Sequence, residues 1–155
     1  LGPTRYAPFV HFHDPNRKSL RFRRSSRFQN LPFVPQFAGK LTGNAIRVPT
    51  PDVSMAILNL DFDREVTREQ INQVLIKAAQ SPETRNQVDY VESPEVVSTD
   101  FVGSNRAGII DGLATVATGN HGVVYVWYDN ENGYSHQVVR VAEEMMLEKS
   151  PSFPR

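Results

Sequence analysis

The sequence predicts an α+β domain whose sheet is mostly antiparallel or mixed, with helices packed on one face. Two observations predict it: several short apolar runs bounded by turn residues, and two separate stretches with helical periodicity. The chain has 155 residues, which is long enough to bury a core in one domain. A membrane-spanning helix is not expected, because a run of about 18 apolar residues is missing.

All of the predicted strands follow residue 45. Val53–Leu60 is apolar on both faces, which favours burial on both sides. The residues Thr118-Gly119-Asn120 favour a turn between the last two strands and therefore a hairpin. The other predicted strands are Ile46–Pro49, Glu95–Val102, Ala107–Ile110, Leu113–Ala117 and Val123–Tyr128.

The first predicted helix begins after Thr67, a suitable N-cap residue, and Gln70 completes a capping box. Ser81-Pro82 is expected to end it. Its apolar residues recur with helical spacing and are expected to form the buried face: Ile71, Val74, Leu75, Ala78 and Ala79.

The second predicted helix begins near Ser135 and is expected to stop at Ser150-Pro151. Its apolar residues again follow helical spacing. We expect them to form an inner stripe of Val138, Val141, Ala142 and Met145.

Residues 1–38 differ in composition from the rest. They hold five prolines and seven basic residues against one acid, whereas residues 39–155 hold ten basic residues and sixteen acids. Because prolines interrupt both helices and central strands, residues 1–38 are predicted to be an irregular or extended, basic, Pro-rich segment. Residues 39–150 form the predicted domain.

Several classes of function are not expected. The chain has no cysteine, so it forms no disulfide and offers no thiolate. The N-terminus lacks the basic-then-apolar pattern of a secretory signal. His11 and His13 share one face of an extended chain, but two ligands without a third do not make a metal site. No GxGxxG phosphate-binding motif occurs.

Three segments carry a family resemblance: GKLTGNAIRVPTPDVS (39–54), EVVSTDFVGSNRAGIID (95–111) and WYDNENGYS (127–135). In this order and spacing they resemble the C-terminal catalytic domain of the phosphorylating glyceraldehyde-3-phosphate dehydrogenases. The resemblance covers roughly residues 36–146. It implies an NAD(P)-dependent oxidation of an aldehyde to an acyl phosphate, in glycolysis or gluconeogenesis, and the α+β fold predicted above.

The resemblance implies that Arg47 binds the phosphate of the sugar-phosphate substrate. A guanidinium suits this role, because its planar fork of N–H donors matches phosphate oxygens. Without the flanking motif, Arg47 would be interpreted as an ordinary solvent-facing strand residue.

The resemblance also implies that Asn130 contacts the nicotinamide carboxamide and that Tyr134 packs beside the same ring. An amide side chain both donates and accepts, so it can orient another amide. The alternative is a plain turn, because Asp-Asn-Glu-Asn-Gly is strong turn chemistry. Asn132 stands where the family usually has a bulky residue. Ser98, Thr99 and Asp100 are assigned a structural role, because Val97, Thr99 and Phe101 alternate as on a buried strand face.

In the family, the cysteine nucleophile, its histidine base and the dinucleotide-binding domain all precede the GKLTG segment. We therefore expect an N-terminally truncated fragment, with no catalytic residue of its own, that is inactive and binds no cofactor alone. The intact family protein uses NAD or NADP and forms homotetramers, and we expect a cytoplasmic location. The competing hypothesis is a non-enzymatic module whose basic N-terminal arm binds nucleic acid or another polyanion. We do not expect nucleic acid as a partner, because such an arm is more often a solvated tail.

Overall fold

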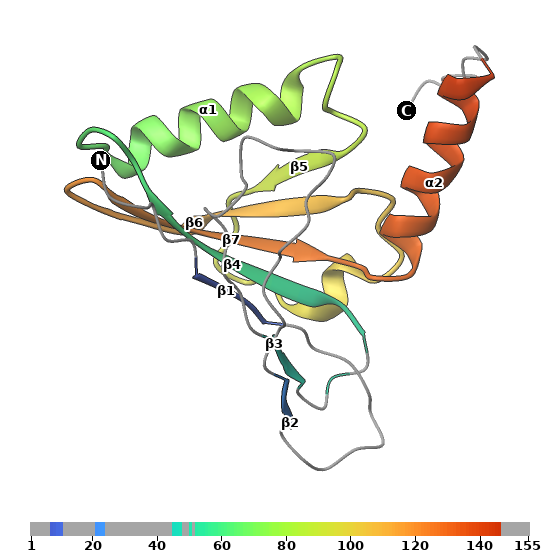
Figure 1. Ribbon diagram of the computed structural model, residues 1–155, viewed down its shortest axis with the longest axis horizontal. Coiled ribbons are helices and arrows are strands. Elements are labelled where there is room, and N and C mark those ends of the chain that lie inside the picture. The colour runs from blue at the N-terminus through green and yellow to red at the C-terminus, as the bar shows by residue number, and fades with distance from the viewer. Residues whose placement is uncertain (1–6, 11–20, 24–44, 48–49, 51, 147–155) are drawn as a thin grey trace.

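A computed structural model describes residues 7–10, 21–23, 45–47, 50 and 52–146 (Figure 1). The described strands are β1 (Ala7–Val10), β2 (Arg21–Arg23), β3 (Ala45–Arg47), β4 (Ser54–Asp61), β5 (Val88–Val91), β6 (Gly108–Thr118) and β7 (His121–Tyr128). The helices are α1 (Arg68–Gln80), the short 3-10 helix η2 (Ser98–Phe101) and α2 (Asn132–Met145). None of the described helices is long and apolar enough to cross a membrane.

Five strands form one mixed sheet in the order β1-β4-β7-β6-β5. The pairs β1–β4, β4–β7 and β6–β7 are antiparallel, whereas β5 and β6 are parallel. Helix α1 lies across the side of the sheet that carries β5 and β6, and α2 rises from the end of β7 (Figure 1). This architecture confirms the predicted α+β class.

The central hairpin matches the sequence prediction closely. Strand β4 pairs with β7 from Ser54↔Tyr128 to Asp61↔His121, so the start of β4 lies beside the end of β7. The predicted turn at Thr118–Asn120 connects β6 to β7. Two separate strands were predicted before it, but β6 is one strand with a bulge between Asp111 and Val116.

Helix α1 has the predicted capping box at Thr67 and Gln70 and ends at Ser81. Its predicted buried face is confirmed for Ile71 and Leu75, which pack in one core cluster, but not for Val74. Val74 is 67% exposed, whereas Asn72 is buried and its Nδ2 donates to the Gly112 carbonyl at 2.9 Å.

The bulge in β6 explains why Asn72 is buried. Irregular pairing leaves carbonyls that need donors, and Arg68 Nη2 donates to the carbonyls of Gly112 and Leu113 at 3.1 and 3.0 Å. The helix therefore presents polar donors beside Ile71, which packs with Ile110 and Val124 in the core.

A second core cluster contains Val53, Phe101 and Ile109. Because Ile109 and Ile110 are consecutive residues of β6, this cluster lies on the opposite face of the sheet from the first. The prediction of a strand over Glu95–Val102 is wrong, because this segment contains η2. Phe101 is buried and stacks on Trp127 with ring centroids 5.5 Å apart, but Val97 is 54% exposed. A helical turn can bury one aromatic ring without the alternation that a strand requires. Strand β5 was not predicted.

Helix α2 starts three residues earlier than predicted, at Asn132. Its expected inner stripe is wrong for the described residues, since Val138, Val141 and Met145 are 48%, 49% and 80% exposed. The reason is position, because α2 rises from the end of β7 and does not lie across the sheet (Figure 1). The predicted stop at Ser150-Pro151 lies outside the described residues.

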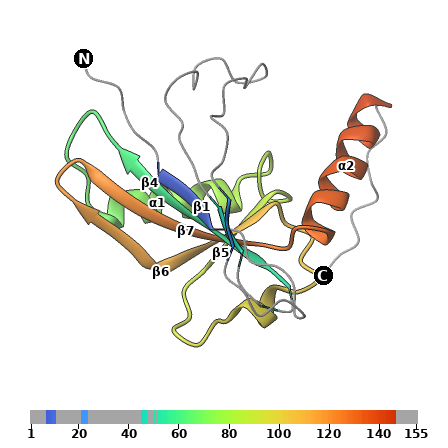
Figure 2. The same cartoon turned by 60° about the horizontal axis from the view of Figure 1, so that its bottom comes forward.

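Two short strands lie within residues 1–38, where irregular or extended chain was predicted. Strand β1 pairs with β4 at the edge of the large sheet (Figure 2), and β2 pairs with β3 through Arg21↔Arg47. The rest of this segment, with His11 and His13, lies outside the described residues. The domain division at residue 38 stays a prediction.

Candidate functional site

A cavity of about 270 Å³ lies where β7 ends and α2 begins. Two of the predicted site residues, Asn130 and Tyr134, line it together. Asn130 lies in the connection after β7, and Tyr134 lies in the first turn of α2. The other lining residues are Ala107, Tyr128, Asp129 and Gln137.

The Asn130 amide is held by the start of β4. Its Nδ2 donates to the Ser54 hydroxyl at 2.7 Å, and Ser54 is fully buried. Ser54 also hydrogen-bonds the phenol of Tyr128, its partner in the sheet register. Burial raises the pKa of Tyr128, and the bond to Ser54 opposes this rise. A hydrogen bond to a buried group fixes the plane of the Asn130 amide.

The residue before Ser54 has an unusual backbone. Val53 has a φ of 66°, a region that β-branched residues rarely occupy. Its amide donates to Asp52 Oδ1 at 2.7 Å, and its side chain packs with Phe101 and Ile109. Such strain persists only where the surroundings enforce it, and it is common at functional sites. Here the unusual backbone of Val53 turns the chain into β4, one residue before Ser54.

Asp129 organises the connection between β7 and α2. Its carboxylate is 3% exposed. Oδ1 accepts from the amides of Glu131 and Asn132 at 3.0 and 2.7 Å, and Oδ2 accepts from the Gly103 amide at 2.8 Å. Three charge-assisted bonds from backbone donors hold the carboxylate and shape the loop that carries Asn130.

Asn132 holds the start of α2 against the loop before β6. Its Nδ2 donates to the carbonyls of Gly103 and Ser104 at 2.7 and 3.0 Å. At this position the amide thus makes two hydrogen bonds to backbone carbonyls. Gly133 adds a close approach, because a Cβ there would lie 2.5 Å from the Arg106 carbonyl oxygen.

Tyr134 is 71% exposed although it lines the cavity, so its ring is accessible to a molecule bound there. Arg47 lies on β3, in the two-stranded sheet, and its side chain lies outside the described part of the structure. The structure thus brings Asn130 and Tyr134 together and leaves the placement of the Arg47 guanidinium a prediction.

Sequence reasoning did not predict the supporting roles of Ser54, Asp129 and Gln137. For Asp129 a signal was present, because an aspartate that opens a turn often accepts from amides two or three residues later. For Ser54 the local sequence carried no signal, since its partner is 76 positions away.

Residues 31–130 match the family described as glyceraldehyde 3-phosphate dehydrogenase, C-terminal domain. A Pseudomonas aeruginosa (strain UCBPP-PA14) protein named glyceraldehyde-3-phosphate dehydrogenase-like protein is 58% identical over 122 residues, which are 79% of this chain and 26% of that protein. The glyceraldehyde-3-phosphate dehydrogenase of Geobacillus stearothermophilus is 46% identical over 110 residues, which are 70% of this chain and 32% of that enzyme.

The glyceraldehyde-3-phosphate dehydrogenase of Borreliella burgdorferi is 40% identical over 115 residues, which are 73% of this chain and 34% of that enzyme. The chain thus spans about a quarter to a third of the length of these curated relatives. The matched family range includes Asn130 and the strained turn into β4. The chain belongs to the glyceraldehyde-3-phosphate dehydrogenase C-terminal domain family.

Proposed function

We propose that this chain forms part of the catalytic domain of an NAD(P)-dependent, phosphorylating glyceraldehyde-3-phosphate dehydrogenase-like oxidoreductase. Asn130 and Tyr134 seat the nicotinamide ring, and Arg47 binds the substrate phosphate. The observation that carries the proposal is the shared cavity, in which Ser54 holds the Asn130 amide beside the accessible ring of Tyr134. The names of the relatives agree with this chemistry.

The residues around the cavity fit the nicotinamide end of the cofactor. A fixed amide can pair with the carboxamide and select one face of the ring, and the exposed Tyr134 ring offers a flat apolar surface beside it. When bound, the cofactor supplies the acceptor for the hydride that leaves the substrate. The chain's own residues orient the ring for that transfer.

Arg47 has the chemistry to hold the other end of the substrate. Its guanidinium is always charged and offers two parallel N–H donors to one phosphate group. Its strand, β3, precedes the strained turn that leads to Ser54, so one short stretch of chain connects the two proposed subsites.

We further propose that the chain as given does not turn over and binds no dinucleotide alone. Family chemistry uses a thiolate nucleophile, and the 155 residues contain no cysteine. The active form would be a homotetramer in the cytoplasm that includes a dinucleotide-binding domain. The competing module with a basic, polyanion-binding arm stays a prediction, because most of that arm lies outside the described residues.

A graft tests the proposal. Residues 39–155 replace the corresponding segment of a family enzyme that supplies the cofactor domain, the cysteine and the histidine, and NADH production is measured with glyceraldehyde 3-phosphate and phosphate. We expect activity in the graft and none in the chain alone. Arg47→Ala should raise KM for the aldehyde more than KM for NAD, whereas the exposed Arg85→Ala should change neither.

The same graft separates the two proposed subsites. Asn130→Ala should raise KM for NAD and lower kcat, because the ring loses its orientation. Turnover by the cysteine-free chain well above the blank would contradict the proposed inactivity. Equal kinetics of the Arg47→Ala and Arg85→Ala grafts would refute the phosphate assignment.

A further inference from the structure

A second cavity of about 220 Å³ lies between α2 and the loops that precede β5 and β6. Among the described lining residues it shares Gln137 alone with the proposed nicotinamide site. Its lining is mostly polar and includes two arginines and a histidine. The lining residues are Asn86, Asn105, Arg106, His136, Gln137, Val139, Arg140 and Glu143.

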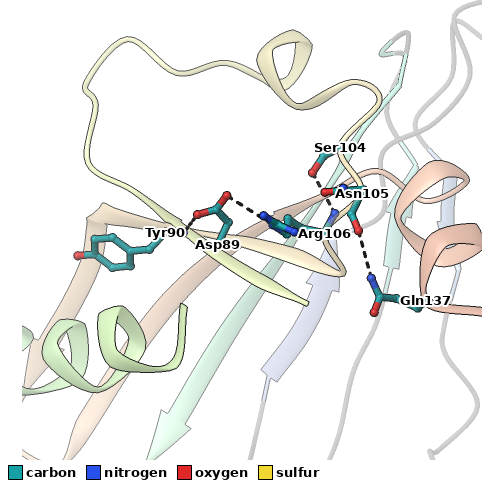
Figure 3. A network of polar contacts seen from close by, with 6 residues as sticks. All are labelled: Asp89, Tyr90, Ser104, Asn105, Arg106 and Gln137. Carbon is teal, nitrogen blue, oxygen red and sulfur yellow. Dashed lines mark hydrogen bonds and ion pairs between the residues drawn. The ribbon is translucent and has the colours of Figure 1, made fainter. Parts of the chain in front are cut away.

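Arg106 is a nearly buried cation with one distant partner. Its side chain is 12% exposed, and its Nε lies 3.7 Å from Asp89 Oδ2 (Figure 3). The Asp89 side chain is 53% exposed, and its other oxygen accepts from the Tyr90 amide at 2.9 Å. A half-exposed carboxylate at this distance compensates little charge. Since a guanidinium has five N–H donors, most of those on Arg106 have no partner among the described residues.

Arg140 adds a second guanidinium whose described partner is neutral. With the Gln87 amide in the orientation that satisfies its hydrogen bonds, its oxygen accepts from Arg140 Nη2 and Nη1 at 3.0 and 3.1 Å. An amide oxygen stabilises a guanidinium but does not cancel its charge. His136 lies one helical turn before Arg140, so the two side chains are neighbours on α2.

Gln137 supplies an acceptor that requires a donor. Its Nε2 donates to the Asn105 carbonyl at 3.2 Å (Figure 3). Its Oε1 is buried and has no hydrogen-bond partner within the described part of the chain. A buried acceptor without a donor costs free energy. A bound group that accepts from the arginines and also carries an O–H would satisfy both needs.

We propose that this cavity binds a small phosphate group that retains a proton, either inorganic phosphate or a phosphate monoester. Arg106 and Arg140 donate to its oxygens, and its hydroxyl donates to Gln137 Oε1. Glu143 on the same wall weakens the binding of anions and favours a singly charged, protonated form. The described lining of this cavity includes no residue of β3, the strand that carries Arg47.

The test uses the full chain, labelled with ¹⁵N, and follows the Nε–H signals of arginine during titration with inorganic phosphate at constant ionic strength. We expect saturable shifts at Arg106 and Arg140. Arg140→Gln should raise Kd at least tenfold, which corresponds to about 1.4 kcal/mol. Glu143→Gln should lower Kd several-fold, and the matched charge control Arg64→Gln should leave Kd unchanged.

A parallel titration with glycerol phosphate shows which of the two ligands the cavity prefers. If glycerol phosphate has the lower Kd, the ligand is a phosphate monoester; if its Kd is equal or higher, the ligand is inorganic phosphate. Equal weakening by Arg140→Gln and Arg64→Gln would overturn the proposal, because it would show general charge attraction. Shifts confined to Arg47 would also overturn it and would leave the function proposed above intact. Should Arg140→Gln not fold, an unchanged Kd in Glu143→Gln would decide against the site.

Discussion

The amide of Asn130 donates to the hydroxyl of Ser54 across 76 positions of sequence. The bond exists because β4 begins where β7 ends, with Ser54 and Tyr128 paired in the sheet. Ser54 is fully buried, so its hydroxyl has little choice of partner. A residue of the predicted cofactor site is thus oriented by the sheet and not by its own turn.

Ser54→Ala should therefore destabilise the chain and loosen Asn130. Loss of a buried hydroxyl that contacts both Asn130 and Tyr128 should lower the free energy of unfolding by about 1–3 kcal/mol. Urea denaturation followed by tryptophan fluorescence measures it. The control is Ser135→Ala, because the Ser135 hydroxyl is exposed and, within the described part of the chain, bonds only the Glu131 carbonyl. A loss no larger than that of the control would show that the Ser54 bonds are weak.

Gly112→Ala should also be destabilising, for a steric reason. A Cβ at position 112 would lie 2.0 Å from the hydroxyl of Tyr90, which packs across the bulge of β6. Overpacking of this kind typically costs about 1–3 kcal/mol. The measurement is a double-mutant cycle by thermal denaturation, in which Tyr90→Ala removes the ring. Additive effects of Gly112→Ala and Tyr90→Ala would contradict the predicted clash.

Tyr90 should make stability fall at high pH. Burial, and then the hydrogen bond from its hydroxyl to Glu92 at 2.7 Å, raise its pKa to about 12. Since an unfolded tyrosine titrates near pKa ~10, the folded chain binds more protons between these values. The contribution of Tyr90 to stability is therefore complete below roughly pH 10 and is lost as pH rises through the folded pKa.

Thermal denaturation at pH values between the unfolded and the folded pKa of Tyr90 checks this prediction. The wild-type chain should lose stability more steeply with rising pH than Tyr90→Phe, which cannot ionise at this position. Glu92→Gln should reduce the steepness, because it removes the carboxylate charge that opposes ionisation. Parallel curves for the wild type and Tyr90→Phe would show that Tyr90 titrates normally when folded.

The sequence predicted correctly the helix start and the turn that depend on interactions between residues close in the chain. The capping box of Thr67 and Gln70 and the turn at Thr118–Asn120 are short-range hydrogen-bond and backbone preferences, and both are confirmed. The pairing of Asn130 with Tyr134 at one cavity agrees with the family resemblance, although their roles stay proposals.

The wrong predictions concern contacts set by distant parts of the chain. On α1 the burial of Asn72 was not predicted, because it depends on a bulge in β6 whose carbonyls require donors. The apolar stripe of α2 has helical periodicity, but its Val138 and Val141 are exposed. Periodicity alone does not indicate whether a helix packs against the face of the sheet or lies beside the sheet. The alternation around Phe101 suggested a strand because a single buried aromatic ring fits either backbone.

The last prediction concerns Asn132, at a position where the family resemblance implies a bulky residue. Its amide holds the carbonyls of Gly103 and Ser104 at 2.7 and 3.0 Å. Helix α2 has few other contacts with the sheet, so loss of these bonds should loosen its first turn. Asn132→Ala should lower the free energy of unfolding by about 1–2 kcal/mol, since both carbonyls are partly accessible to water.

Hydrogen exchange measured by NMR localises this effect. In Asn132→Ala the amides of α2 should exchange several-fold faster, while those of β4 and β7 change only by the global loss of stability. Asn86→Ala is the matched control, because Asn86 is exposed and makes no side-chain hydrogen bond within the described residues. Uniform acceleration across α2 and the sheet would mean that the helix and the sheet open as one unit, and Asn132 would then stabilise the whole domain and not the helix start.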